Sequence, residues 1–434
     1  MEKTRHMSTS PLPREMGFGG AFALVVNLQL GSAMFLLPRP LSEYGVWGVL
    51  SWLVTGCGAM ALCHIFSALA IYKPMVGGPH VYIRAAFGKR WGFYAGWTYW
   101  VAAWLSSIPL ILLGTSALEH MVGDLGGFGR LAVQMGGLWA LMGLNIRGAQ
   151  LSGIGEVVFS VLKVLPLMAI PLFGLYFFDV KILNEPVAMP AFSALSAASL
   201  LTFWGFVGLE AGTTVADCVK NPGKTIPRAL FLGTFLVMAL YFINTLSIFG
   251  IVPRAILSQS PNAYAALFQH TLGAGWDKFI QGLVFVMCFG SLNSWLLASG
   301  QVALTAANSG LFPSFFNKIN GKNSPVMGIK ITTLCLMACI LLLRSQSFAQ
   351  QIDTLITLSV TLLIMIYVVI AAALIKFMHK KNIARSPLLL VSLTISIVFC
   401  TWTLVTTSPK IILGSLLIPA SGYVLARLLR WPVW

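Results

Sequence analysis

The chain has 434 residues, of which 57% are hydrophobic and only 9% are charged. A soluble domain carries about 25% charged residues, so this composition excludes an ordinary soluble enzyme, a disordered chain and a secreted disulfide scaffold. The 28 lysines and arginines against 12 acidic residues give a net charge of +16, but so few charges cannot form the dense basic face that nucleic acid requires. In a chain this apolar, an excess of cations is instead typical of membrane topology.

Apolar segments of about 20 residues, the length that crosses a bilayer, follow one another along the whole chain. They predict an all-α integral membrane protein, with a polar tail at residues 1–16 and a short surface helix at 258–270. The twelve predicted transmembrane helices are 17–42, 46–71, 90–118, 128–146, 153–178, 195–216, 227–251, 276–309, 326–343, 353–377, 386–406 and 410–429.

The cations are unevenly divided between the loops on the two sides of these spans. With the N-terminus inside, twenty cations fall inside, seven fall outside and Lys163 falls within a span, which accounts for all 28. Cytoplasmic loops carry the excess of Lys and Arg, so both termini are predicted to be cytoplasmic, in an inner or plasma membrane. Seven acidic residues are expected outside and balance the outside cations, so the excess charge is an orientation signal.

Two spans contain clusters of small residues that interrupt a helix near its middle. The clusters are Gly31-Ser32-Ala33 in the first span and Trp204-Gly205-Phe206-Val207-Gly208 in the sixth. Glycine also permits close helix packing, but interruptions at matching positions of two repeats, with Glu210 two residues on, favour a transporter site. Backbone N–H groups freed at a break suit a carboxylate and freed carbonyls suit an ammonium, so the pattern predicts an α-amino acid as substrate.

Longer motifs around these clusters resemble the amino acid–polyamine–organocation (APC) transporters. The matching segments are 31–38, 206–211 with 219–229, 295–301 and 308–313, the last two resembling the eighth helix of the arginine/agmatine antiporter branch. The resemblance implies two inverted five-helix repeats, 17–178 and 195–377, followed by two helices within 386–429. It also implies a homodimer.

The resemblance assigns roles to individual residues. It implies that the backbone of Ser32 and Ala33 meets the substrate's carboxylate, with Gly31 as a further substrate-binding position, and that Trp295 forms an aromatic platform under the substrate's side chain. An aromatic face attracts an ammonium or guanidinium group without the desolvation cost of a buried carboxylate partner. The resemblance also implies that Trp204 and Val207, with Gly205 between them, surround the amino end of the substrate. It implies that Glu210 is a gating and proton-linked carboxylate. Tyr99 and Trp100 match the gate region of the third helix.

Three residues depart from the pattern of the arginine/agmatine branch. Ala33 replaces the second glycine of the first-helix motif, which narrows the site by a methyl group. Ser107, a further substrate-binding candidate, stands where that branch has asparagine, and Leu110 replaces a methionine. These departures disfavour arginine itself and leave an α-amino acid or its amine relative as the substrate class.

Two ionisable residues lie in the middle of predicted spans. Lys163 lies about ten residues, or about 15 Å, into the fifth span, where an unpaired charge is energetically costly. A functional role is therefore favoured over the alternative, in which the long side chain reaches the membrane interface. The resemblance implies that Lys163 occupies the place of sodium in sodium-coupled relatives and exchanges a proton, whereas the arginine/agmatine antiporters lack this lysine. Glu210 either caps broken-helix N–H groups or couples transport to protons.

The sequence therefore predicts a secondary active transporter, favouring an antiporter of basic amino acids and polyamines over proton-coupled uptake of neutral amino acids. A membrane enzyme would need clustered His, Asp or Glu, and a channel would not need paired broken helices or a buried lysine. The seven cysteines and six histidines show no metal-ligand spacing, so no metal or cofactor is expected. The expected partners are a small-molecule substrate, protons, the lipid bilayer and a second copy of the chain.

Overall fold

The structure is a computed structural model that describes residues 17–31, 33–73, 77–147, 167–210, 219–260, 262–273, 275–321, 324–343, 348–380 and 383–431. These segments are almost entirely helical, because a chain in lipid must satisfy its backbone hydrogen bonds internally. The predicted tail 1–16, Ser32 and Lys163 lie outside the described residues.

The first half of the chain contains the helices up to the second predicted break. They are α1 (Phe18–Gln29), α2 (Ala33–Leu36), α3 (Pro38–Ser42), α4 (Val46–Tyr72), α5 (Pro79–Phe87), α6 (Lys89–Leu105), α7 (Ile108–Val122), α8 (Gly126–Arg147), an apolar helix Leu167–Phe177, α10 (Val180–Leu183), α11 (Ala191–Phe203) and the 3₁₀ turn η1 (Trp204–Phe206).

The second half contains longer helices. They are α13 (Pro222–Ile251), α14 (Arg254–Gln259), α15 (Ala263–Leu272), α16 (Trp276–Asn308), η2 (Ser314–Asn317), α17 (Val326–Leu343), α18 (Phe348–His379), α19 (Pro387–Thr406) and α20 (Pro409–Leu428). The segment expected to be a surface helix is divided between α14 and α15, and α15 buries the side chains of Ala263–Phe268.

Nine segments of the described chain are long and apolar enough to cross a membrane, and they correspond to nine of the twelve predicted spans. The fourth predicted span is α8, and the sixth is the interrupted helix Ala191–Phe206. The fifth lies largely outside the described residues, which contain only Leu167–Phe177 at its end. The protein is therefore an all-α, multi-pass membrane protein.

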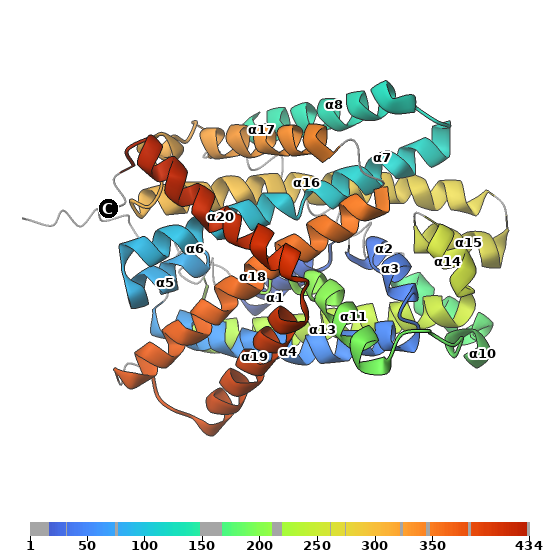
Figure 1. The fold of residues 1–434 in the computed structure, drawn as a ribbon, viewed down its shortest axis with the longest axis horizontal. Coiled ribbons are helices and arrows are strands. Elements are labelled where there is room, and N and C mark those ends of the chain that lie inside the picture. The colour runs from blue at the N-terminus through green and yellow to red at the C-terminus, as the bar shows by residue number, and fades with distance from the viewer. Residues whose placement is uncertain are drawn as a thin grey trace, which may run out of the picture.

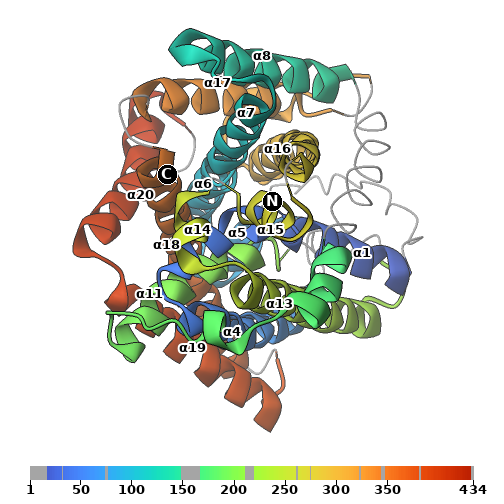
Figure 2. The ribbon, with the colours of Figure 1, turned by 90° about the vertical axis from the view of Figure 1, so that its right-hand side faces the viewer.

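The helices form two sets that the long helix α18 joins (Figure 1). In one set α4 packs against α13, α11 and α19, and α1 packs against α13. In the other set α16 packs against α6, α7 and α17, and α8 covers α17 and α7. Figure 2 shows the same division from the side, with α4 and α13 on one side of α16 and with α8 and α17 on the other.

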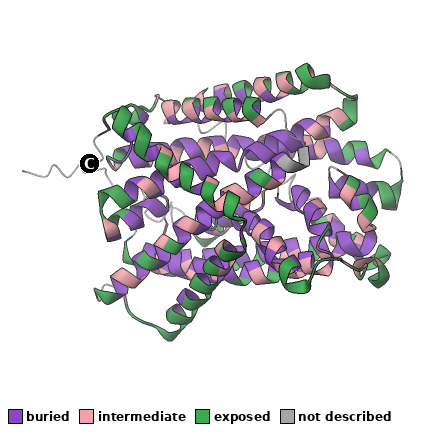
Figure 3. Ribbon diagram, in the orientation of Figure 1, coloured by how far each residue is buried: buried purple, intermediate pink, exposed green. Residues whose placement is uncertain are grey.

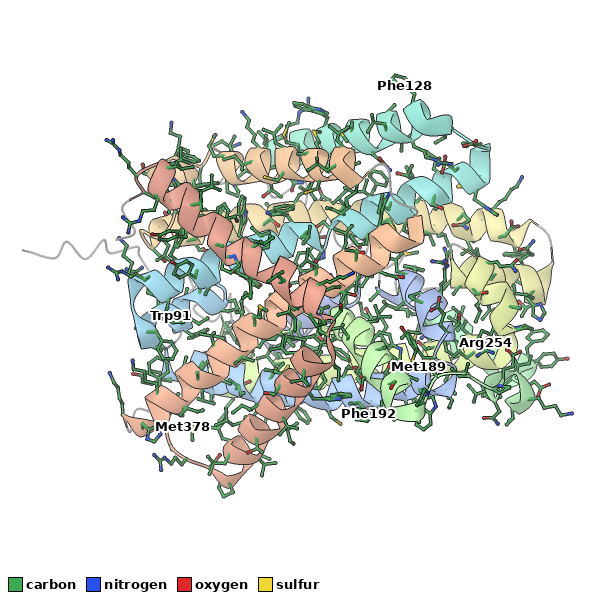
Figure 4. All side chains as sticks on the ribbon, viewed as in Figure 1. Trp91, Phe128, Met189, Phe192, Arg254 and Met378 are labelled. Atoms are coloured by element: carbon green, nitrogen blue, oxygen red, sulfur yellow. The ribbon has the colours of Figure 1, made fainter. Side chains whose placement is uncertain are left out.

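The outer faces of the helices carry large apolar side chains. Figure 3 shows buried residues along the inner faces and exposed residues along the outer sides of α8, α19 and α20. In Figure 4, Phe128 points away from the molecule, and Trp91, Phe128 and Phe192 are 54%, 84% and 66% exposed. Such a surface suits lipid rather than water.

Candidate substrate site at two helix breaks

The first span is interrupted where the Gly31 cluster predicts it. Helix α1 ends at Gln29, Leu30 leaves the helical conformation with ψ of 74°, and α2 begins at Ala33. The Tyr241 hydroxyl of α13 donates to the Gln29 carbonyl at 2.7 Å and accepts from the Gly31 N–H at 3.3 Å. The Gly31 N–H also donates to the Gln29 carbonyl at 2.7 Å, so the phenol adds a second hydrogen bond to each of these two backbone groups at the break.

The second interruption follows α11. The helix tightens into the 3₁₀ turn η1, and Val207 is extended with φ −60° and ψ 130°. Gly208 has φ of +99°, a conformation that glycine adopts without the strain of a Cβ atom. The break closes on itself through Val207 N–H donating to the Trp204 carbonyl at 3.2 Å and Leu209 N–H donating to the Phe206 carbonyl at 3.1 Å.

The two breaks meet at one small cavity between the two sets of helices. The α1 side and its break contribute Leu28, Gln29, Gly31 and Ala33, the second break contributes Trp204 and Val207, and the other set of helices contributes Ser106 and Trp295. The cavity has a volume of about 20 Å³. Because one water needs about 10–15 Å³, the cavity has room for about one water and must widen to admit a substrate.

Five of the predicted binding residues line this cavity, and these are Gly31, Ala33, Trp204, Val207 and Trp295. Two other predicted binding residues, Gly205 and Ser107, do not line the cavity. A Cβ atom on Gly205 would lie 2.7 Å from the Trp52 ring, so Gly205 allows α4 to approach the break. Ser107 is buried, and its hydroxyl donates to the Ala103 carbonyl at 3.2 Å.

Ser106 takes the place at the cavity that Ser107 was expected to occupy. It lies where the third span, predicted to be continuous, divides into α6 and α7. Pro109, in the first turn of α7, lacks the N–H that would continue the helix, so its position is the signal that locates this bend.

Sequence reasoning also missed Gln29. Its side-chain Nε2 donates to the Thr234 hydroxyl at 3.0 Å, while its Oε1 is buried with no hydrogen-bond partner among the described residues. A buried carbonyl oxygen on a cavity wall is a ready acceptor for an ammonium or amide donor. Nothing in the local sequence distinguishes Gln29 from a helix-packing residue.

Glu210 lies next to the second break and is fully buried. The Tyr99 hydroxyl of α6 donates to its Oε1 at 2.6 Å, and the Tyr367 hydroxyl of α18 donates to its Oε2 at 2.8 Å. Both carboxylate oxygens therefore act as acceptors, which suits the ionised form. The pairing of Glu210 with Tyr99 joins two residues that the sequence assigns to gating, whereas Tyr367 has no motif of its own.

In the part of the chain that the structure describes, no three or more His, Cys, Asp or Glu side chains gather as a metal site would require. The cavity residues are instead aromatic rings, small side chains and single polar groups, a set that suits an organic cation.

Comparison with known proteins identifies the family of the chain. The sequence profile of the amino acid permease family matches residues 16–422. The chain belongs to the amino acid permease family. Membership confirms the APC resemblance predicted from the motifs, and it supports a transporter rather than an enzyme.

Several relatives of this permease have names that describe transport. It is 31% identical over 368 residues to the putrescine transporter PotE of Haemophilus influenzae, with 83% of each chain covered. It is 28% identical over 374 residues to the putrescine transporter PotE of Escherichia coli, again with 83% of each chain covered. A putative arginine/ornithine antiporter of Bacillus subtilis is 28% identical over 402 residues, with 85% of each chain covered.

Proposed function

We propose that this permease is an antiporter that exchanges cationic amino acids, their amine derivatives, or both, by alternating access. The observation that carries the proposal is the meeting of two helix breaks at one small cavity between two sets of helices. Rocking of one set against the other would open such a cavity to each side of the membrane in turn. The names of the relatives, a putrescine transporter and an arginine/ornithine antiporter, agree with this substrate class.

The cavity wall offers groups that suit a cationic substrate. Trp204 and Trp295 supply aromatic rings, and Gln29 supplies a carbonyl oxygen that has no hydrogen-bond partner among the described residues. An aromatic face attracts an ammonium or guanidinium group by about 0.5–2 kcal/mol. Putrescine has an ammonium at each end, whereas arginine and ornithine also have a carboxylate, for which we propose the backbone at Ser32 and Ala33.

We propose that Glu210 links the substrate cycle to protons, together with Lys163. The carboxylate lies three residues beyond the cavity residue Val207, and its two phenol partners come from α6 and α18. A change of protonation at Glu210 would alter contacts to both helices at once. Lys163 enters this proposal from the sequence alone, because a lone cation in the middle of a span is costly without a function.

The proposed topology has twelve spans, with inverted repeats over 17–178 and 195–377 and two further helices within 386–429. Nine apolar spans, with α8, Leu167–Phe177 and Ala191–Phe206 as the other three, support this count. We further propose that both termini face the cytoplasm of an inner or plasma membrane and that the protein is a homodimer. Cross-linking in membranes and labelling of cysteines placed in single loops test these two points.

Exchange assays with proteoliposomes test the proposed function. Vesicles loaded with putrescine, ornithine, arginine or a neutral amino acid are diluted into labelled substrate, with and without a pH gradient. We expect uptake that depends on an internal cationic substrate. Uptake of neutral amino acids that follows the pH gradient and ignores the internal substrate would overturn the antiporter in favour of proton-coupled uptake.

A matched pair of tryptophans in α16 tests the site. Trp295 lines the cavity, whereas Trp276, at the start of the same helix, is 46% exposed. We expect Trp295→Leu to weaken substrate binding roughly 3- to 30-fold, the equivalent of a lost cation–π contact, and Trp276→Leu to leave it unchanged. Equal effects of the two substitutions would remove Trp295 from the proposed site.

A further inference from the structure

A second and larger hollow lies on the outer surface of the protein, between α4, α13 and α19, and it has a volume of about 820 Å³. We call it the α4–α13–α19 groove. Its volume falls within the ~300–1,000 Å³ typical of ligand sites. Figure 1 shows these three helices beside one another, away from α8 and α17. The substrate cavity shares none of the groove's residues.

Each helix presents one stripe of side chains to the groove. On α13 the stripe is Arg228, Phe231 and Leu232, with the i, i+3, i+4 spacing of one helix face. On α19 it runs from Leu388 to Ile395 with the same spacing, and on α4 it runs from Cys57 to Ser67. The walls are predominantly apolar and include exposed residues, so the groove faces the lipid phase or another molecule.

One end of the groove is cationic. Arg228 is exposed, and no hydrogen bond or ion pair joins it to another residue in the described segments. Lys224 lies one turn earlier on α13, and Arg385 lies two residues before α19 begins. An apolar groove with an unpaired arginine at its mouth is complementary to a ligand with an anionic head and an apolar tail.

Deeper in the groove lies one polar pair. His64 Nδ1 and Ser392 Oγ are 2.9 Å apart, which joins α4 to α19. The neighbouring Cys63 contacts the Thr234 hydroxyl at 3.2 Å. Because Thr234 lies six residues beyond Arg228 on α13, the polar pair lies about 9 Å deeper than the arginine.

The apolar part of the groove continues past this pair. Cys57 lies seven residues from His64 on α4, or about 10 Å further along the helix axis. The whole groove is thus about 20 Å deep. This depth matches the thickness of one leaflet, which consists of half of the hydrocarbon core of about 30 Å and one headgroup region. From its mouth inward, the groove presents a cation, a hydrogen-bonding pair and an apolar wall. A phospholipid presents its phosphate, its ester groups and its acyl chains in the same order.

We propose that the α4–α13–α19 groove binds an anionic phospholipid of the leaflet that faces Arg228, which is the cytoplasmic leaflet in the topology proposed above. The phosphate pairs with Arg228, the glycerol esters lie at the depth of His64 and Ser392, and an acyl chain fills the apolar part. A second copy of this chain is a poorer occupant, because its own cations gather at the same side of the membrane, whereas the lipid supplies the opposite charge.

Thermal unfolding of the purified full chain in a nonionic detergent tests the proposal. The protein is titrated with phosphatidylglycerol, with phosphatidylcholine of the same acyl chains, and with sn-glycerol 1-phosphate, which is the anionic head without chains. We expect phosphatidylglycerol to raise the unfolding temperature more than phosphatidylcholine at every concentration and glycerol phosphate to have no effect. Equal stabilisation by the two lipids, or stabilisation by glycerol phosphate as strong as that by phosphatidylglycerol, would overturn the proposal.

Three variants locate the effect. Arg228→Gln should weaken the apparent affinity for phosphatidylglycerol about fivefold and remove the preference over phosphatidylcholine. Arg147→Gln, an exposed arginine at the end of α8, is the matched control and should behave as the parent protein. Val391→Trp, at a position 54% exposed in the groove, should weaken the binding of both lipids.

Two results of the variant series contradict the proposal. An unchanged phosphatidylglycerol preference in Arg228→Gln would place the anion elsewhere. A shift of Val391→Trp from dimer to monomer in light scattering, with lipid stabilisation unchanged, would assign the groove to a second copy of the chain.

Discussion

Each of the two helix breaks leaves backbone groups without their helical hydrogen-bond partners, and the two breaks satisfy these groups in different ways. At the first break, a side chain from another helix, Tyr241, bonds to the backbone on both sides of the interruption. The second break is closed by its own 3₁₀ turn and by the positive φ of Gly208, and it leaves Glu210 held between Tyr99 and Tyr367. Both breaks contain backbone hydrogen bonds of their own, which at the first is the bond from the Gly31 N–H to the Gln29 carbonyl at 2.7 Å. The first break adds a side-chain bond from α13, whereas the second presents a charge to α6 and α18.

The largest expected effect concerns the charge at the second break. We expect Glu210→Gln to slow exchange about 10- to 100-fold, because a charge-assisted hydrogen bond contributes about 1.5–3 kcal/mol and about 1.4 kcal/mol is tenfold in rate. The amide keeps the shape of the carboxyl group, so the protein should remain folded. Exchange rates in proteoliposomes across pH measure the effect, and a variant with the parental rate and pH profile would contradict a coupling role.

The two tyrosines that hold Glu210 give the next effect. Tyr99→Phe and Tyr367→Phe should each destabilise the protein by about 1.5–3 kcal/mol, because each removes a hydrogen bond to a buried carboxylate. The double variant tests whether the two phenols act as one unit, since members of a shared network are not additive. Unfolding temperatures in detergent measure both quantities, and strictly additive shifts would show that the two phenols act independently.

At the first break, Tyr241→Phe should destabilise the protein by about 1–3 kcal/mol, because the Gly31 N–H and the Gln29 carbonyl lose their shared partner. The phenylalanine ring keeps the stacking on Trp52, whose ring centroid lies 4.5 Å away. Tyr264→Phe is the matched control, because it removes a buried hydroxyl that bonds to Asn244 instead of a break. We expect only Tyr241→Phe to reduce exchange as well, and equal losses in both variants would refute a special role.

The smallest effects compare one glycine from each break. Gly208→Ala should destabilise the protein by about 1–2 kcal/mol, since its φ of +99° disfavours a Cβ atom and Leu28 lies 3.3 Å from where that atom would be. Gly31 is not in the left-handed region, and among the described residues the nearest atom to a Cβ placed there would be the Gln29 carbonyl oxygen at 3.9 Å.

Gly31→Ala should therefore leave the unfolding temperature nearly unchanged and act on substrate affinity, because it narrows the cavity wall. Unfolding temperature and half-saturating substrate concentration, measured for both variants, separate the two roles. If Gly31→Ala proved the more destabilising substitution, the contrast between the two breaks would be wrong.

Much of the site could be predicted from the chain because breaks have local causes. Small residues at Gly31 and at Gly205–Gly208 occupy matching positions of two predicted repeats, which is the pattern that favours helix breaks, and Trp204 and Trp295 follow from motifs near them. The contributions of Gln29, Tyr241 and Tyr367 could not be predicted this way. Each lies in a regular helix, and its role depends on which helix faces it across the fold.

The assignment of Ser107 illustrates the limit of reasoning by position. A resemblance aligns residues along the chain, but one residue in a helix corresponds to a rotation of about 100°, which carries a side chain to another face. The hydroxyls of Ser106 and Ser107 both donate to carbonyls of α6, but at the bend before Pro109 Ser106 lines the cavity and Ser107 does not.

The class of this protein follows from its amino-acid sequence, because the free energy of placing a segment in lipid depends on the apolar side chains and the backbone of that segment. The sequence also indicates where two helices are interrupted, since glycine clusters act locally. Only the tertiary structure decided that the breaks meet at one cavity, that Tyr241 bonds across the first, and that Tyr99 and Tyr367 hold Glu210. Those contacts join residues more than a hundred positions apart, and only packing of the helices brings such residues within hydrogen-bonding distance.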